Sequence, residues 1–275
     1  METISNHSVK FGELFGPVIH GSAIFDWHLW STQQFADMQG YTFQELMNNN
    51  EIPYAPVSIA AKIFQYPTIG DRISVEAMPI NVGESSITLA HMIYTASDKK
   101  IGELKSTHVT ISPDNTAKNL PEEVRSALAE DTVNYDSPIQ VYEEYDKVTA
   151  DYIFSDQFNI QSSHIEGSKL AYFEEYPRFL YTALERFISS HGREPEETRY
   201  GEKPHNLSKW AWRFQAPVPY RSRLALECKI EKQDDTCRVS HEMHVDGKKC
   251  IVGFSDFTRF NGDGHPVSGD PFPMI

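Results

Sequence analysis

The sequence has few cysteines and few basic residues, and each shortage excludes a class of protein. Three cysteines in 275 residues, with no CxxC pair and no Cys/His ligand spacing, do not predict a zinc site. All three lie in strand-like segments, so we expect Cys228, Cys237 and Cys250 to be buried, reduced thiols. Against 39 acidic residues stand only 25 Lys and Arg, and the net charge of −14 disfavours nucleic acid as a partner.

Long apolar runs and nucleotide-binding motifs are also missing. No run approaches the roughly 18 residues of a membrane span, and the polar segment Met1 to Lys10 lacks a signal-peptide core. We therefore expect a cytoplasmic protein with no membrane partner. The chain has no P-loop, no GxGxxG dinucleotide motif and no serine nucleophile elbow. Accordingly we predict no permanently bound cofactor and no metal.

What the sequence does contain is an internal repeat at a spacing of about 150 residues. Each half has an aromatic-rich helix followed by four strand-like segments separated by turn residues. In the first half we predict a helix at 26–39 and strands at 54–66, 72–82, 85–96 and 100–111. In the second half we predict a helix at 170–190 and strands at 208–216, 223–232, 236–245 and 248–260.

Short matches in the same order support the repeat. Residues 73–76 match residues 224–227, and His91 matches His241 within similar strand segments. We interpret both histidines as structural. The predicted boundaries are a first repeat at 1–125, a connector at 126–149 and a second repeat at 150–275.

The second helix carries an apolar stripe that must be buried against the antiparallel strands. We interpret this stripe as core rather than as a ligand-binding surface. It consists of Leu170, Phe173, Tyr176, Leu180, Leu184 and Phe187.

Residues 52–114, together with the preceding helix, resemble the hotdog fold of 4-hydroxybenzoyl-CoA-type thioesterases. Residues 172–179 are similar to the start of the long helix of those enzymes. The resemblance implies an α+β fold: a tandem, or double, hotdog with two antiparallel sheets, each wrapped around a long helix. It also implies that the substrate is a thioester of coenzyme A or phosphopantetheine.

A narrower set of cues resembles the double-hotdog acyltransferase/decarboxylase family of leinamycin biosynthesis. The cues are Asp26-Trp27, the turn at 70–72, the segment 83–85 and the segment 170–173. This resemblance implies that a (methyl)malonyl-type unit is decarboxylated and transferred from coenzyme A to an acyl carrier protein, as in polyketide-type biosynthesis.

The loop before each helix departs from the thioesterase pattern in a different way. Phe15 takes the position of the loop carboxylate in the first repeat, which suggests that this half has lost hydrolytic chemistry. Glu166 takes it in the second repeat, followed by Gly167 and Ser168. We predict Glu166 as a catalytic base or nucleophile, and Gly167 and Ser168 as substrate-binding residues, because a helix start offers free N–H groups to a thioester oxygen.

Two further catalytic candidates come from the first repeat. Hotdog modules pair so that one helix start faces the partner's first long strand, which brings Tyr54 towards the 166–167 loop. The leinamycin-family resemblance implies that Tyr54 carries the acyl group; its alternative role is to donate a hydrogen bond. His28 is a candidate acid/base at the second, pseudo-equivalent site, with a histidine bonded beside Asp26 as the structural alternative.

Coenzyme A phosphates or an acidic carrier protein would need cations on this acidic chain. We predict that Arg213, Arg221 and Arg223 bind substrate, with solvated turn charges as the alternative. The expected partners are acyl-CoA, an acyl carrier protein and, as an open question, a second copy in a homodimer. Besides decarboxylating transfer, an acyl-CoA or acyl-carrier thioesterase and a non-catalytic acyl-binding protein remain open.

Overall fold

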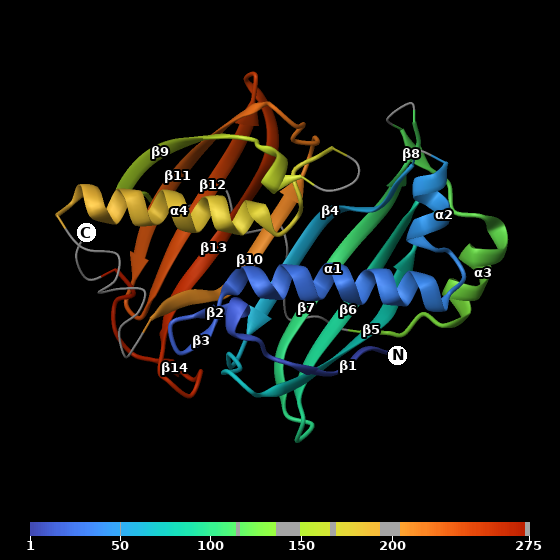
Figure 1. Cartoon of the computed structure of the whole chain (residues 1–275), viewed down its shortest axis with the longest axis horizontal. Helices are drawn as coiled ribbons and strands as arrows, with labels where there is room; N and C mark the ends of the chain where they lie inside the picture. The colour runs from blue at the N-terminus through green and yellow to red at the C-terminus, as the bar shows by residue number, and fades with distance from the viewer. Residues whose placement is uncertain (50, 114–115, 136–148, 166–168, 193–203, 273–275) are drawn as a thin grey trace.

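Two long helices cover one face of a single large β-sheet in the computed structural model (Figure 1). The structure describes residues 1–49, 51–113, 116–135, 149–165, 169–192 and 204–272. Helix α1 (Gly21–Met38) belongs to the first repeat and helix α4 (Glu175–Ser190) to the second. The shorter helices are α2 (Phe43–Asn48) and α3 (Glu122–Glu130).

Within the described residues the sheet has 12 strands, and every neighbouring pair is antiparallel. Its main path runs in the order β1 (Glu2–Ser8), β5 (Arg72–Val82), β6 (Ser86–Thr95), β7 (Lys100–Ile111), β4 (Ile52–Ile63), β10 (His205–Phe214), β13 (Lys248–Phe260), β12 (Thr236–Val245), β11 (Arg223–Gln233) and β9 (Tyr152–Asn159). The short strands are β8 (Ala117–Lys118) beside β7, β14 (Pro266–Val267) beside β13, and the hairpin β2 (Leu14–Phe15) with β3 (Val18–Ile19).

The two repeats join along strands β4 and β10, which differs from the expected pair of separate sheets. Ala60 pairs with Ala211 at this junction, and both side chains are buried. Each expected sheet is therefore one half of a continuous sheet. The tandem hotdog arrangement itself is present, since each half of the sheet has its own long helix packed on the same face (Figure 1).

The strand register confirms that the two halves are repeats. His91 in β6 lies opposite Ala77 in β5, and His241 in β12 lies opposite Cys228 in β11. Both partners stand four residues after the matched positions 73 and 224. The structural environments of the two histidines are therefore directly comparable.

Most predicted elements are present, and the two helix starts differ for local reasons. Helix α1 begins five residues earlier than predicted because the His20 side chain accepts a hydrogen bond from the Ser22 N–H and caps the helix. Helix α4 begins five residues later because Leu170 and Ala171 form β-bridges with Pro219 and Ile165. The edge strands β1 and β9 were not predicted.

The core lies between the helices and the sheet and is continuous across the repeats. Phe25 of α1 stacks on Trp210 of β10, with ring centroids 5.1 Å apart. The Asn206 side chain donates a hydrogen bond to the Ile19 carbonyl at 2.8 Å, and the Tyr66 hydroxyl donates to the Leu207 carbonyl at 2.6 Å. Neither half thus completes its core without the other.

Cys228, Cys237 and Cys250 are free and buried in strands, as predicted. Among the described residues, no helix combines the length and the apolar character that crossing a membrane requires.

Candidate functional site

A pocket of about 640 Å³ lies where the two repeats meet. The first repeat contributes α1, α2 and the start of β4, and the second contributes the segment before α4 and the end of β10. The lining residues are Asp26, Leu29, Trp30, Gln33, Phe43, Met47, Tyr54, Ala55, Pro56, Val57, Ile111, Leu170, Ala171, Tyr172, Phe173, Tyr176, Phe214, Gln215, Ala216 and Pro217.

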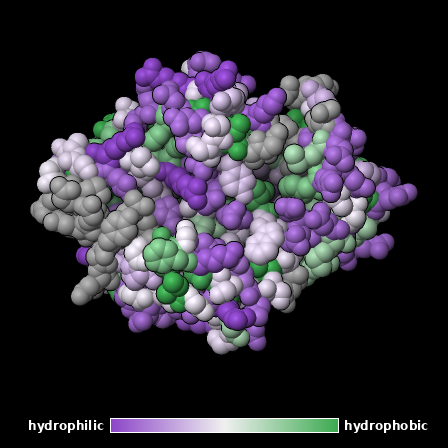
Figure 2. All heavy atoms as spheres, in the orientation of Figure 1, coloured by the Kyte–Doolittle hydropathy of each residue, from purple (hydrophilic) through white to green (hydrophobic). Residues whose placement is uncertain are grey.

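Apolar side chains make up most of the wall. Figure 2 shows hydrophobic atoms in a hollow near the middle of the face that carries the helices. A volume in the range of small-molecule sites, together with an apolar wall and a few polar groups, suits an acyl chain ending in a polar thioester. The pocket is therefore the place to look for chemistry.

Asp26 is the one carboxylate among the described residues that line this pocket. It lies on α1, and its Oδ1 accepts a hydrogen bond of 2.7 Å from the Tyr172 hydroxyl of the second repeat. This bond fixes the carboxylate across the junction of the two repeats. The sequence marked Asp26 only as a family cue, although a helix carboxylate facing the partner module was the signal that could have identified it.

Glu174 provides a second carboxyl group next to Asp26. Burial, with the nearby charges of Asp26 and Glu175, raises the pKa of Glu174 to about 7. An ion pair with Arg178, at 2.5 Å, opposes this rise. The start of α4 thus holds a carboxyl group that changes charge near neutral pH.

Tyr54 lies in this pocket wall on a strained stretch of backbone. Its φ of 46° is rare for an aromatic residue, and the pairing of β4 with β7 shifts register between Ile52 and Ala55. The ring stacks on Phe43 at 5.2 Å, and burial raises the Tyr54 pKa above its ordinary value. Tyr54 and Leu170 of the second repeat line the same pocket, while the predicted approach of Tyr54 to residues 166–167 falls outside the described residues and stays a prediction.

The predicted residues Glu166, Gly167 and Ser168 lie outside the described part of the chain. They stay predictions. Leu170 follows them closely and lines the pocket.

The surroundings of His28 differ from those expected for an acid/base group. It is buried, and within the described residues neither ring nitrogen has a hydrogen-bond partner, so it is not bonded to Asp26 as the structural alternative supposed. Burial lowers its pKa well below the ordinary value, with the neighbouring His91 and His108 adding to the effect. His28 is not among the pocket-lining residues.

The three predicted arginines occupy different places. Arg213 precedes Phe214, which lines the pocket; because neighbouring strand residues point to opposite faces, Arg213 points away from it. Arg221 has its guanidinium 5.1 Å from the Tyr220 ring centroid. Arg223 begins β11, three strands away from Arg213. Arg223 is therefore separated from Arg213 by two intervening strands.

The apolar stripe before and within α4 divides into two functional parts. Leu170, Phe173 and Tyr176 line the pocket, whereas Leu180 and Leu184 are fully buried in the core. The interpretation as core is confirmed for Phe173, Tyr176, Leu180 and Leu184, which all belong to the buried core. Leu170, Phe173 and Tyr176 also form part of the candidate binding surface.

Comparisons with known proteins agree on the fold. No family model matches the sequence. Over 139 residues the sequence is 26% identical to 1,4-dihydroxy-2-naphthoyl-CoA hydrolase of Prochlorococcus marinus (strain NATL1A), covering 47% of this chain and 92% of the relative.

Solved structures resemble the chain over nearly its whole length. A protein described as an oleoyl thioesterase from Lactobacillus plantarum superposes with a TM-score of 0.76, covering 97% of this chain and 98% of that one, at 13% identity. The 12:0-ACP thioesterase from Umbellularia californica gives a TM-score of 0.71, covering 92% and 96%, at 13% identity. The similarity to these solved structures shows a double hotdog fold.

Proposed function

We propose that the chain hydrolyses an acyl thioester in the pocket between its two repeats. The observation that supports this most directly is Asp26, a carboxylate held by Tyr172 on the wall of an otherwise mainly apolar pocket. The similarity to a CoA-thioester hydrolase over 139 residues supports the same class of reaction. The coenzyme A or carrier arm is the polar part of such a substrate, and the acyl chain is the apolar part.

The reaction requires a base and a stabilised oxyanion. Asp26 takes a proton from a water molecule, and the water oxygen attacks the thioester carbonyl carbon. The N–H group of Phe173, a pocket-lining residue just before α4, donates a hydrogen bond to the oxyanion. The tetrahedral intermediate then loses the thiolate, which receives the proton from Asp26, and the free acid leaves.

Cations for the phosphates of the carrier arm lie on the second-repeat side of the pocket. Lys169 is exposed beside the pocket residue Leu170, and its carbonyl accepts a hydrogen bond from the Tyr220 N–H. That bond places Arg221, next along the chain, close to the same rim. Lys169 and Arg221 are thus better positioned for a phosphate than Arg213 is.

Decarboxylating transfer to an acyl carrier protein is the second candidate. Tyr54 favours it, because a strained tyrosine on the pocket wall fits the tyrosine that the leinamycin-family resemblance implies. Its raised pKa opposes ionisation to a nucleophilic phenolate, so hydrogen-bond donation to substrate is the better-supported role.

The test is product analysis on a panel of simple acyl-CoA, malonyl-type CoA and acyl-carrier thioesters. Hydrolysis predicts equal amounts of free thiol and free acid. Asp26→Asn should lower kcat by about 10²- to 10⁴-fold, and Asp98→Asn should retain activity because Asp98 lies in an exposed turn with a φ of 58° that asparagine tolerates.

Two outcomes would overturn the proposed hydrolysis, and a third would overturn the role of Asp26 as the general base. Carbon dioxide and acylated carrier without net hydrolysis would establish transfer instead. Tight acyl-CoA binding without turnover would establish a binding protein. If Glu166→Gln abolishes hydrolysis while Asp26→Asn does not, the base is Glu166 and the role given to Asp26 is wrong.

A further inference from the structure

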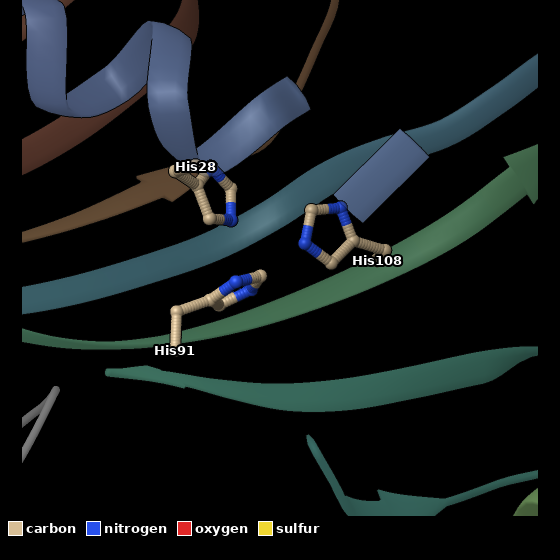
Figure 3. A group of neighbouring side chains, drawn as sticks. All are labelled: His28, His91 and His108. Atoms are coloured by element: carbon tan, nitrogen blue, oxygen red, sulfur yellow. The ribbon is translucent and has the colours of Figure 1, made fainter. Parts of the chain in front are cut away.

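Three buried histidines from different parts of the first repeat meet behind the wall of the pocket. His28 comes from α1, His91 from β6 and His108 from β7, and their rings point towards one another (Figure 3). One nitrogen of each ring lies within 4.8 Å of the others, and all three side chains are at most 1% exposed. Such a group needs an explanation, because buried polar atoms in folded proteins normally have partners.

Hydrogen bonds around His91 determine which of its nitrogens carries the proton. The Thr3 hydroxyl donates to the Val75 carbonyl, so its oxygen can only accept from Ser31. The Ser31 proton is used in that bond, and Ser31 must therefore accept from His91 Nδ1, at 3.0 Å. With Nδ1 protonated, neutral His91 presents a lone pair on Nε2.

The same reasoning applies to His108. Its Nδ1 lies 2.8 Å from the Tyr54 carbonyl oxygen, which can only accept, so Nδ1 donates and Nε2 holds a lone pair. Ser106 lies 2.8 Å from this Nε2 and 3.3 Å from that of His91. One hydroxyl proton faces two lone pairs, so one of the two nitrogens lacks a donor.

His28 completes the group with no hydrogen-bond partner for either nitrogen among the described residues. Burial disfavours the charged form of all three rings, because each side chain is at most 1% exposed. A neutral His28 also has one nitrogen lone pair to offer. Each ring therefore has one nitrogen lone pair, one nitrogen of each ring lies within 4.8 Å of the others, and a single serine hydroxyl lies near two of the rings.

We propose that His28, His91 and His108 form a binding site for a first-row divalent transition metal ion, with Zn²⁺ as the test ion. Neutral imidazole is a preferred ligand of this class. The bonds from the Nδ1 atoms of His91 and His108 to Ser31 and to the Tyr54 carbonyl are the outer contacts that orient metal-binding histidines. Zn–N bonds of about 2.0–2.1 Å require nitrogens about 3.3 Å apart, so the rings must draw together on binding.

The second repeat offers an internal comparison. His241 takes the place of His91, but the strand register puts Phe257 where the first repeat has His108. The Trp212 ring packs against His241 with centroids 4.6 Å apart. A buried histidine at this sheet position is thus common to both repeats, whereas the three-histidine group within the described residues belongs only to the first.

The site would link the helix to the sheet beside the substrate pocket. The Tyr54 carbonyl accepts from His108, and the His28 ring packs against Phe173 at 5.5 Å, while Tyr54 and Phe173 line the pocket. The role proposed is binding, independent of whether the pocket hydrolyses a thioester. This departs from the sequence prediction of no metal.

The experiment measures metal binding directly on the full chain. The protein is stripped with a chelator, and Zn²⁺ affinity is measured by competition with a chromophoric chelator; Co²⁺ absorption reports the ligand geometry. The wild type should bind one equivalent. His28→Phe, which keeps the ring volume, should lose more than the roughly 10- to 100-fold that removing an outer contact costs, and Ser31→Ala should lose within that range.

His241→Phe is the matched control, since it replaces a buried histidine at the equivalent sheet position and should retain binding. Circular dichroism and thermal unfolding in chelator verify that each variant is folded, and His108→Gln replaces His28→Phe if the latter is not. Equal Zn²⁺ affinity of wild type and His28→Phe, or an equal loss in His241→Phe, would overturn the proposal. A Co²⁺ spectrum typical of octahedral oxygen ligands would overturn it as well.

Discussion

Replacing Glu174 by glutamine should make the stability of the protein less sensitive to pH. The Glu174 side chain is only 15% exposed, beside Asp26, and its pKa is raised from 4.5 to about 7. Between these two pH values the folded state keeps the proton while the unfolded state has released it. The unfolded state then binds fewer protons, so the free energy of unfolding falls as pH rises through this window.

The size of the effect follows from the shift. A rise from 4.5 to about 7, at 1.36 kcal/mol per pH unit, sets an upper limit of about 3 kcal/mol above pH 7. Below pH 4.5 Glu174 does not lower the free energy of unfolding, because it is protonated in both the folded and the unfolded state. Relative to wild type, Glu174→Gln should therefore gain up to about 3 kcal/mol between pH 4 and pH 8.5.

Urea unfolding over that pH range measures the difference. Substitutions at two neighbours serve as controls, because they should shift the pKa of Glu174 in opposite directions. Asp26→Asn should lower this pKa, because the Asp26 charge raises it, and Arg178→Gln should raise it, because the Arg178 charge lowers it. A stability difference between Glu174→Gln and wild type that does not change with pH would refute the reasoning.

Two further predictions concern a close contact between the repeats and a buried ion pair within the second repeat. A Cβ atom at Gly264 would lie 1.7 Å from the Tyr66 carbonyl oxygen at a φ of +76°, so Gly264→Ala should cost on the order of 3 kcal/mol; an unchanged urea midpoint would contradict this. Asp256 pairs twice with Arg238 at 2.7 Å in a buried setting, so Asp256→Ala should cost about 3–5 kcal/mol, and a double variant with Arg238→Met should recover much of it in a double-mutant cycle.

The parts of the fold that the sequence predicted are those with local signals. Strands β5, β7, β12 and β13 begin and end at the predicted residues, because turn residues separate them from their neighbours. Asp98 and Asp246 adopt positive φ in two of these turns, a conformation that aspartate tolerates. The alternation of apolar and polar residues, together with the turn residues, is therefore sufficient to predict the strands of these hairpins.

The junction of the repeats could not be predicted in this way. Ala60 and Ala211 pair across strands from different repeats, and neither periodicity nor turn residues specify which strand edges meet. The edge strand β1 was missed because it pairs on only one side, so its burial pattern is irregular. Long-range pairing depends on the whole fold.

The site was predicted in outline and missed in detail. Tyr54, named from the family resemblance, lines the pocket between the repeats, and its catalytic role stays a prediction. The sequence marks the pocket carboxylate Asp26 only as a family cue, because the thioesterase pattern points first to the loop before each helix. The group of His28, His91 and His108 escaped notice because metal motifs are recognised by close spacing, and these residues meet only in the folded chain.

The β4–β10 junction also determines how the molecule tolerates change. Because the sheet, the helix layer and the core all continue across it, unfolding of either half exposes the core of the other. The two repeats should therefore unfold in one transition, although each resembles an independent module in sequence. A destabilising substitution anywhere in the first repeat then lowers the fraction of molecules with a complete pocket. Selection for function therefore acts on the stability of both repeats together.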